Sequence, residues 1–73
     1  MIAKFVNKTE INHNVIYDLH FYYVLDGEEK QAEYSLGGVI FERPYDATDI
    51  INRAKNVATN FFPDEILTEI IFE

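Results

Sequence analysis

Cysteine is absent from this chain of 73 residues, and proline (two) and glycine (three) are scarce. Without cysteine the chain has neither a disulfide nor a thiolate metal site. Its two histidines are too few for a structural zinc site, so we expect no metal and no other cofactor. A domain this short buries little more than half of its unfolded surface, so it needs either a dense core or self-association for stability. Six phenylalanines and five tyrosines supply material for such a core.

Basic residues are the second shortage. Six lysines and arginines stand against thirteen aspartates and glutamates, which gives a formal net charge of -7. Proteins that bind nucleic acid neutralise its phosphates with lysine and arginine, so the excess of acid argues against direct nucleic-acid binding and against attraction to anionic membranes. The charge favours a basic protein as partner, and an acidic excess also serves solubility alone.

A long apolar run is missing from the N-terminus as well. Residues 1–8, MIAKFVNK, match neither a secretion signal nor a membrane span. The lack of cysteine fits a reducing compartment, and together these features predict a cytoplasmic protein. No linker, internal repeat or low-complexity segment is visible, and we predict one small domain over residues 1–73.

The clearest pattern that is present is the alternation in residues 15–25, VIYDLHFYYVL. Every second residue from Val15 is apolar or aromatic. Because side chains on a strand point alternately to its two faces, the segment is predicted to be a strand with Tyr17, Leu19 and Phe21 in the core. The residues between them are mixed in character and are expected to face outwards: Ile16, Asp18, His20, Tyr22 and Val24.

Turn residues and alternation place the neighbouring strands. Asp26-Gly27 predicts a tight hairpin, and residues 30–41 read as a third strand that Gly37-Gly38 interrupts. This glycine pair indicates either a bulge in one long strand, which we favour, or a second hairpin turn. Residues 2–8 are predicted to form a first strand, and residues 9–14, TEINHN, a polar loop or a wide hairpin turn.

A helix is predicted after the third strand, because apolar residues then recur at helical spacing. Asp46 or Thr48 is the expected N-cap, and Pro63 is expected to end the helix. The apolar stripe comprises Ile50, Ile51, Ala54, Val57, Ala58, Phe61 and Phe62. Residues 65–72 alternate again and are predicted to form a last strand.

The predicted fold class is α+β, with one helix packed as a second layer on a four-stranded, mostly antiparallel sheet. The order of elements along the chain is β-β-β-α-β. The last strand can pair beside the first or beside the third strand. We favour the first, which gives the spatial order 3-2-1-4.

Asp18, His20 and Tyr22 share one strand face and are the strongest candidates for acid-base chemistry. Residues two apart on a strand are about 6.6 Å apart along it, and no serine or cysteine nucleophile accompanies them at a readable spacing. We therefore predict no catalytic residue and no enzyme. A set of carboxylates at the hairpin lacks the spacing of a calcium loop and is interpreted as a solvated turn. This set is Asp26, Glu28, Glu29 and Glu33.

The outward face of the sheet is the predicted partner-binding surface. If the helix covers the face that holds Tyr17, the opposite face combines apolar residues with a rim of carboxylates. Such a surface is typical of contacts between proteins. The predicted partner-binding residues are Ile16, Asp18, His20, Tyr22, Val24, Glu33, Leu67, Glu69 and Ile71.

These features suggest a non-catalytic protein-protein interaction module, a small acidic inhibitor or regulator that docks on a basic, nucleic-acid-handling protein. In size and charge alone, the chain is similar to small inhibitors of phages and mobile elements, such as anti-CRISPR and DNA-mimic proteins, whose carboxylates stand where phosphates bind. The alternative is a homodimeric structural or accessory domain that uses the same face. A small enzyme or ligand carrier built on His20 is disfavoured, because a pocket takes core volume that so short a chain lacks.

Overall fold

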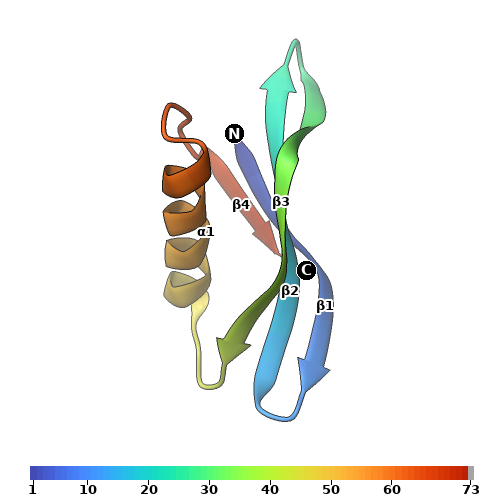
Figure 1. Ribbon diagram of the computed structural model, residues 1–73, viewed down its shortest axis with the longest axis vertical. Helices are drawn as coiled ribbons and strands as arrows, with labels where there is room; N and C mark the ends of the chain where they lie inside the picture. Colours follow the sequence, from blue (N-terminus) through green and yellow to red (C-terminus); the bar gives the residue numbers. More distant parts are fainter. Residues whose placement is uncertain (73) are drawn as a thin grey trace.

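The computed structural model describes residues 1–72, which form one helix and one four-stranded sheet. The strands are β1 (Ile2–Ile11), β2 (Asn14–Leu25), β3 (Glu28–Glu42) and β4 (Glu69–Phe72), and the helix is α1 (Ala47–Phe61). β2 pairs antiparallel with β1 and β3, β4 pairs parallel with β1, and the spatial order is β3-β2-β1-β4. Figure 1 shows α1 lying along one side of this sheet. The predicted fold class and the pairing of the last strand beside the first are confirmed.

The core lies between α1 and the inward face of the central strand β2. Tyr17, Leu19 and Phe21 are buried, as the alternation predicts, and belong to one cluster with Ile50 and Ala54 of the helix. A strand that buries one face and leaves the other partly solvated gives this alternating pattern. The sheet face away from α1 is called the outer face below.

Aromatic rings fill much of the core. Phe5 of β1, Tyr17 of β2 and Phe41 of β3 contact one another edge to face, with centroid distances of 5.6 to 6.2 Å. Aromatic pairs prefer this arrangement to a face-to-face sandwich. Because each ring comes from a different strand, the cluster ties three strands together beneath the helix.

The helix begins where the sequence places its cap. Of the two candidates, Asp46 is the N-cap: its Oδ1 accepts a hydrogen bond from the backbone N–H of Asp49 at 3.0 Å, and Asp49 Oδ2 accepts from the N–H of Asp46 at 3.0 Å. This reciprocal pair is a capping box, which satisfies two donors that would otherwise lack partners. The helix ends at Phe61, followed by Phe62 as C-cap and then Pro63.

The ends of two strands differ from their predicted positions. Of the two alternatives for residues 9–14, the loop is wrong and the hairpin turn is present, although it is tighter than predicted, because β1 continues to Ile11 and the chain turns back at Asn12. The last strand begins at Glu69 and not at residue 65, because β1 begins at Ile2, the residue opposite Glu69. A strand needs a neighbour for its hydrogen bonds, and β1 supplies one only from that point.

Gly37-Gly38 forms a bulge within β3, the alternative favoured from the sequence. Asp18 of β2 lies opposite the glycine pair, where the register between β2 and β3 shifts. Gly38 has a φ of 67°, in the left-handed region that glycine reaches without a steric penalty. β3 therefore continues as one strand of 15 residues.

Candidate functional site

The outer face carries most of the predicted partner-binding residues. The β2 residues of this set alternate with the buried core residues, and all except Val24 are partly buried. Glu69 and Ile71 of β4 pair with β1 residues whose side chains point to the same face. The structure thus brings these residues together on one face: Ile16, Asp18, His20, Tyr22, Val24, Glu69 and Ile71.

Leu67 does not belong to this face. It precedes β4 and packs against the core cluster. The prediction failed because the alternation of residues 65–72 was extended to residues that are not in the strand. Glu33 is exposed and lies in β3 between the pairs His20–Ser35 and Tyr22–Gln31, where the register shifts a second time.

One part of the outer face is closed by contacts within the chain. Lys4 Nζ lies 4.5 Å from the centre of the Tyr22 ring and 2.8 Å from Glu29 Oε2. Its pKa is raised, chiefly by the hydrogen bond to Glu29. Beside them Ile2, also on the outer face, is only 7% exposed. The aliphatic stem of a lysine can cover apolar surface while its ammonium group stays in contact with water and a carboxylate, so this region offers a partner little apolar surface.

Asp18 is held by both neighbouring strands. Its Oδ2 accepts a hydrogen bond from Asn7 Nδ2 at 2.9 Å, and its Oδ1 accepts from the backbone N–H of Gly38 at 3.3 Å. Asn7 has a φ of 55° and lies where the register between β1 and β2 shifts. Each donor therefore lies in a bulge, one in β1 and one in β3. The carboxylate predicted as a partner contact joins these two bulges.

The contacts of Asp18 predict a pH-dependent contribution to folding. The Asn7 amide, followed by the Gly38 N–H, holds the pKa of the Asp18 carboxyl below its ordinary value of 3.8. Because the folded state has the lower pKa, this stabilisation is fully present above the ordinary value and is lost as the pH falls through the folded value. We expect Asp18→Asn to lower the free energy of unfolding at pH 7, and the difference from the wild type to shrink towards pH 3. Urea unfolding at the two pH values measures it, and an equal difference at both would contradict the assignment.

The catalytic candidates on this face do not form a relay. His20 Nδ1 lies 3.5 Å from Gln31 Nε2, whereas the Asp18 carboxylate is occupied by the two bulges. Among residues 1–72, no group of three histidine, aspartate or glutamate side chains is placed to hold a metal ion. We therefore assign no reaction to this face.

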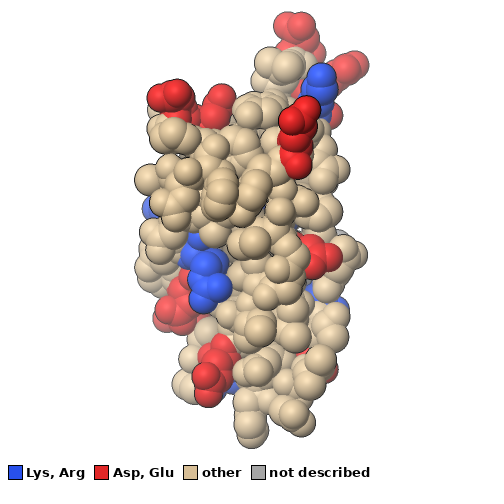
Figure 2. All heavy atoms as spheres, viewed as in Figure 1, with Lys and Arg blue, Asp and Glu red and all other residues tan. Residues whose placement is uncertain are grey.

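Carboxylates gather at the end of the domain that holds the β2–β3 hairpin, called the acidic end below. This end includes the loop between α1 and β4, because Phe62 packs on Tyr23 at a centroid distance of 6.2 Å and the Met1 ammonium donates to Ile66 O at 3.0 Å. Figure 2 shows acidic side chains around the hairpin tip and near the C-terminal end of the helix. Its acidic residues are Asp26, Glu28, Glu29, Glu33, Asp64, Glu65 and Glu69, and its lysines are Lys4 and Lys30.

The opposite end has balanced charge. Four acidic and four basic residues lie at this end and along the helix. The acidic residues are Glu10, Glu42, Asp46 and Asp49, and the basic residues are Lys8, Arg43, Arg53 and Lys55. The net negative charge of the chain is therefore concentrated at the acidic end. Sequence reasoning noted the carboxylates of the hairpin but missed those of the loop after α1, since only the fold brings the two segments together.

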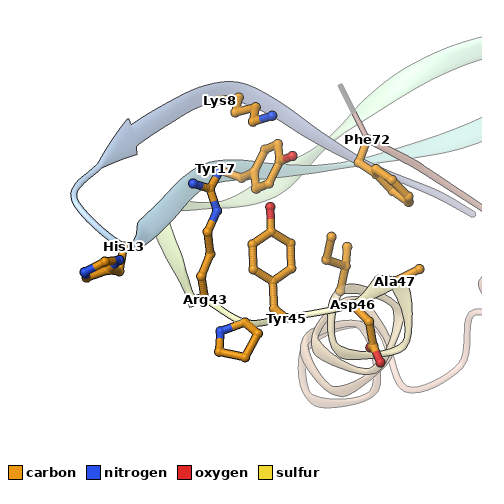
Figure 3. Close-up of a pocket in the computed structure, with 10 residues that line it drawn as sticks. Lys8, His13, Tyr17, Arg43, Tyr45, Asp46, Ala47 and Phe72 are labelled. Atoms are coloured by element: carbon orange, nitrogen blue, oxygen red, sulfur yellow. The ribbon is translucent and has the colours of Figure 1, made fainter.

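A groove of about 730 Å³ lies at the balanced end, between the β1–β2 turn and the start of α1. In Figure 3, Tyr45 extends from the segment before α1 towards Tyr17, with Lys8 and Arg43 nearby. Glu10 Oε1 lies 3.2 Å from Lys8 Nζ and 2.9 Å from an Arg43 nitrogen. These two cations lower the pKa of Glu10, with the Lys8 hydrogen bond as the largest cause. Because Glu10 engages both cations, we assign no anion site to this groove.

A second groove of about 480 Å³ lies at the acidic end, under the β2–β3 hairpin. We call it the hairpin groove and define it by Tyr23, Leu25, Ala32, Glu33, Tyr34 and Phe62. This groove was not predicted from the sequence. The one available signal was the pair of aromatic residues at the end of the helix stripe, Phe61 and Phe62.

Comparison of this chain with protein-family models, with curated proteins and with solved structures finds no match. Within residues 1–72, α1 is too short and too polar to cross a membrane.

Proposed function

We propose that this protein is a non-catalytic interaction module, an acidic inhibitor or regulator that binds a basic, nucleic-acid-handling protein. The observation that supports the proposal is the concentration of carboxylates at the acidic end. The carboxylates of the hairpin project from two paired strands. A patch of one sign steers an oppositely charged partner and favours the correct orientation.

The predicted outer face contributes to this proposal where it meets the acidic end. Val24 and Glu69 lie there, and Glu33 is close by on β3. Ile16 and Asp18 lie farther along β2, towards the balanced end. We therefore propose that the partner approaches the acidic end and covers only the adjacent part of the outer face.

Charge removal at the acidic end tests the proposal. The variant combines Glu28→Gln, Glu33→Gln and Glu65→Gln, and Glu42→Gln on the balanced end of β3 is the control. The immobilised wild type is expected to retain basic proteins from a bacterial lysate at about 0.1 M salt and to release them near 0.5 M, because salt screens exposed charges. The triple variant is expected to lose most of this retention, and the control to keep it.

Two results would contradict the proposal. Retention that is the same from low to high salt would remove the electrostatic mechanism, and so would retention by the triple variant equal to that of the wild type. Mass spectrometry of the eluted proteins identifies them, and acidic or neutral proteins in place of basic ones would also count against it.

Self-association through the outer face is a second candidate. Exposed apolar side chains favour it: Val24 is 52% exposed, Ile40 49% and Ile71 38%. Sedimentation of the purified protein at micromolar concentration distinguishes the two candidates. A strict monomer rules out the homodimer, whereas a dimer that Ile40→Lys splits would assign the outer face to a second copy.

A further inference from the structure

The hairpin groove exists because the β2–β3 hairpin is longer than the rest of the sheet. β1 begins opposite Tyr22, so Tyr23 to Leu25 and their β3 partners extend beyond β1 as a two-stranded ribbon. Asp26 and Gly27 close this ribbon with φ values of 52° and 79°, the conformation that two-residue hairpins favour. Figure 1 shows the ribbon projecting past the end of α1. Its inward face therefore continues beyond the helix that covers the rest of the core.

The floor of the groove is aromatic and already packed. Phe62 lies against Tyr23 and Tyr34 at centroid distances of 6.2 and 6.1 Å, and Phe61 stacks on Tyr34 at 3.9 Å. Rings held in such contacts lose little additional freedom when a partner binds. Nevertheless, Leu25, which lines the groove, is 59% exposed. The groove therefore combines an aromatic floor with an apolar side chain that contacts within residues 1–72 leave largely in water.

Acidic residues lie in and beside the groove. Glu33 lines it, Glu28 pairs with Leu25 across the ribbon, and the backbone N–H of Glu65 donates to Phe62 O at 3.0 Å. Lys30 is the cation among the lining residues. A second copy of the chain would bring the same carboxylates together, and like charges across an interface disfavour association. A basic partner is complementary to the excess of carboxylates at the acidic end, in which the groove lies.

We propose that the hairpin groove binds a short basic segment of the partner protein, with one apolar or aromatic side chain on Tyr23, Leu25 and Phe62. Lysines or arginines on both sides of that side chain then lie beside the carboxylates of Glu33 and Glu65. The inference rests on the proposed function and adds the binding site and the chemistry of the bound segment. Apolar contact at the centre with charged groups at the rim is the usual anatomy of such interfaces.

Three synthetic peptides test the inference by titration into the ¹⁵N-labelled protein. The first has one tryptophan flanked on both sides by lysines and arginines, the second has serine in place of tryptophan, and the third has glutamine in place of every basic residue. The first peptide is expected to shift the amide resonances of Tyr23, Leu25, Ala32, Tyr34 and Phe62. The serine peptide and the glutamine peptide are each expected to bind about tenfold more weakly, because one loses apolar burial and the other the charge complementarity.

Neighbouring residues of the ribbon supply a matched pair of variants. Leu25→Ser removes an exposed side chain from the groove, and Val24→Ser removes a similarly exposed one from the outer face of the same strand. Leu25→Ser is expected to weaken binding of the tryptophan peptide about tenfold, and Val24→Ser to leave it unchanged. The two side chains are more than half exposed, so both variants are expected to keep the wild-type spectrum away from the substitution.

The outcomes separate the inference from the proposed function. The basic peptide can bind in a salt-sensitive way but shift resonances on the outer face, or bind equally well to Leu25→Ser. Either result overturns the hairpin groove as the binding site and leaves the proposed function in place. If the glutamine peptide binds in the groove as tightly as the basic peptide, the inference and the proposed function are both overturned, because each requires a basic partner. The absence of any shift at millimolar basic peptide overturns both as well.

Discussion

Replacement of Phe5 by alanine is expected to unfold most of this domain. Phe5 is fully buried and its ring contacts those of Tyr17 and Phe41 at 5.6 and 5.8 Å. Truncation of a buried phenylalanine costs about 3–5 kcal/mol, which is comparable to the entire stability of a domain of this size. Circular dichroism with urea titration measures the loss, and we expect no cooperative transition for Phe5→Ala.

Val6 provides the control for this prediction. It follows Phe5 on β1, points to the outer face and is only partly buried. We expect Val6→Ala to cost roughly 1 kcal/mol and to keep a cooperative transition. Phe5→Leu, which keeps most of the volume, is expected to cost less than Phe5→Ala. A folded Phe5→Ala as stable as Val6→Ala would show that the three-ring cluster does not tie the three strands together.

Substitution of Gly38 by valine is expected to have the next largest effect. Gly38 has a φ of 67°, a region that a β-branched residue reaches only with strain of about 1–3 kcal/mol. The same backbone conformation presents the Gly38 N–H to Asp18 Oδ1, so relaxation of the strain breaks this hydrogen bond. Gly38→Val is therefore expected to lower the urea midpoint clearly while the domain remains folded.

Gly37, which directly precedes Gly38, provides a closely matched control. Gly37 lies outside the left-handed region, and a Cβ added there meets Asp18 Oδ1 at 3.5 Å, an ordinary contact. Gly37→Ala is expected to change the midpoint little. Gly38→Asn is expected to cost less than Gly38→Val, because asparagine tolerates the left-handed region, as Asn7 and Asn12 do in this chain. Equal effects of Gly37→Ala and Gly38→Val would contradict the role assigned to the bulge.

The parts of the fold that the sequence predicts are those with a strict period and one buried face. The alternation around Leu19 identifies both the central strand and its inward side, and Asp26-Gly27 identifies the hairpin. The sequence also narrows the N-cap to Asp46 or Thr48, and the structure assigns it to Asp46, whose capping box involves residues only three positions apart. In each case the pattern that decides the prediction lies within one continuous segment of the sequence.

The errors arise where distant segments decide the structure. The start of β4 depends on where β1 begins, so residues 65–68 alternate without forming a strand, and Leu67 packs on the core. β1 continues past a bulge at Asn7 to Ile11, and no turn residue pattern in the sequence indicates this bulge. The hairpin groove depends on how far the ribbon extends beyond the helix end. The hydrogen bonds that hold Asp18 could not be predicted, because its two donors lie on other strands.

The carboxylate of Asp18 also makes the positions of β1 and β3 depend on each other. If either flanking strand slid along β2 by one residue, its inward side chains would move to the opposite face, and Asp18 would lose the donor from that strand. A single charge in the middle of the sheet therefore opposes slippage on two sides at once. Removal of this charge should make both strand pairings less unique, so that amide exchange rises in β1 as well as in β3.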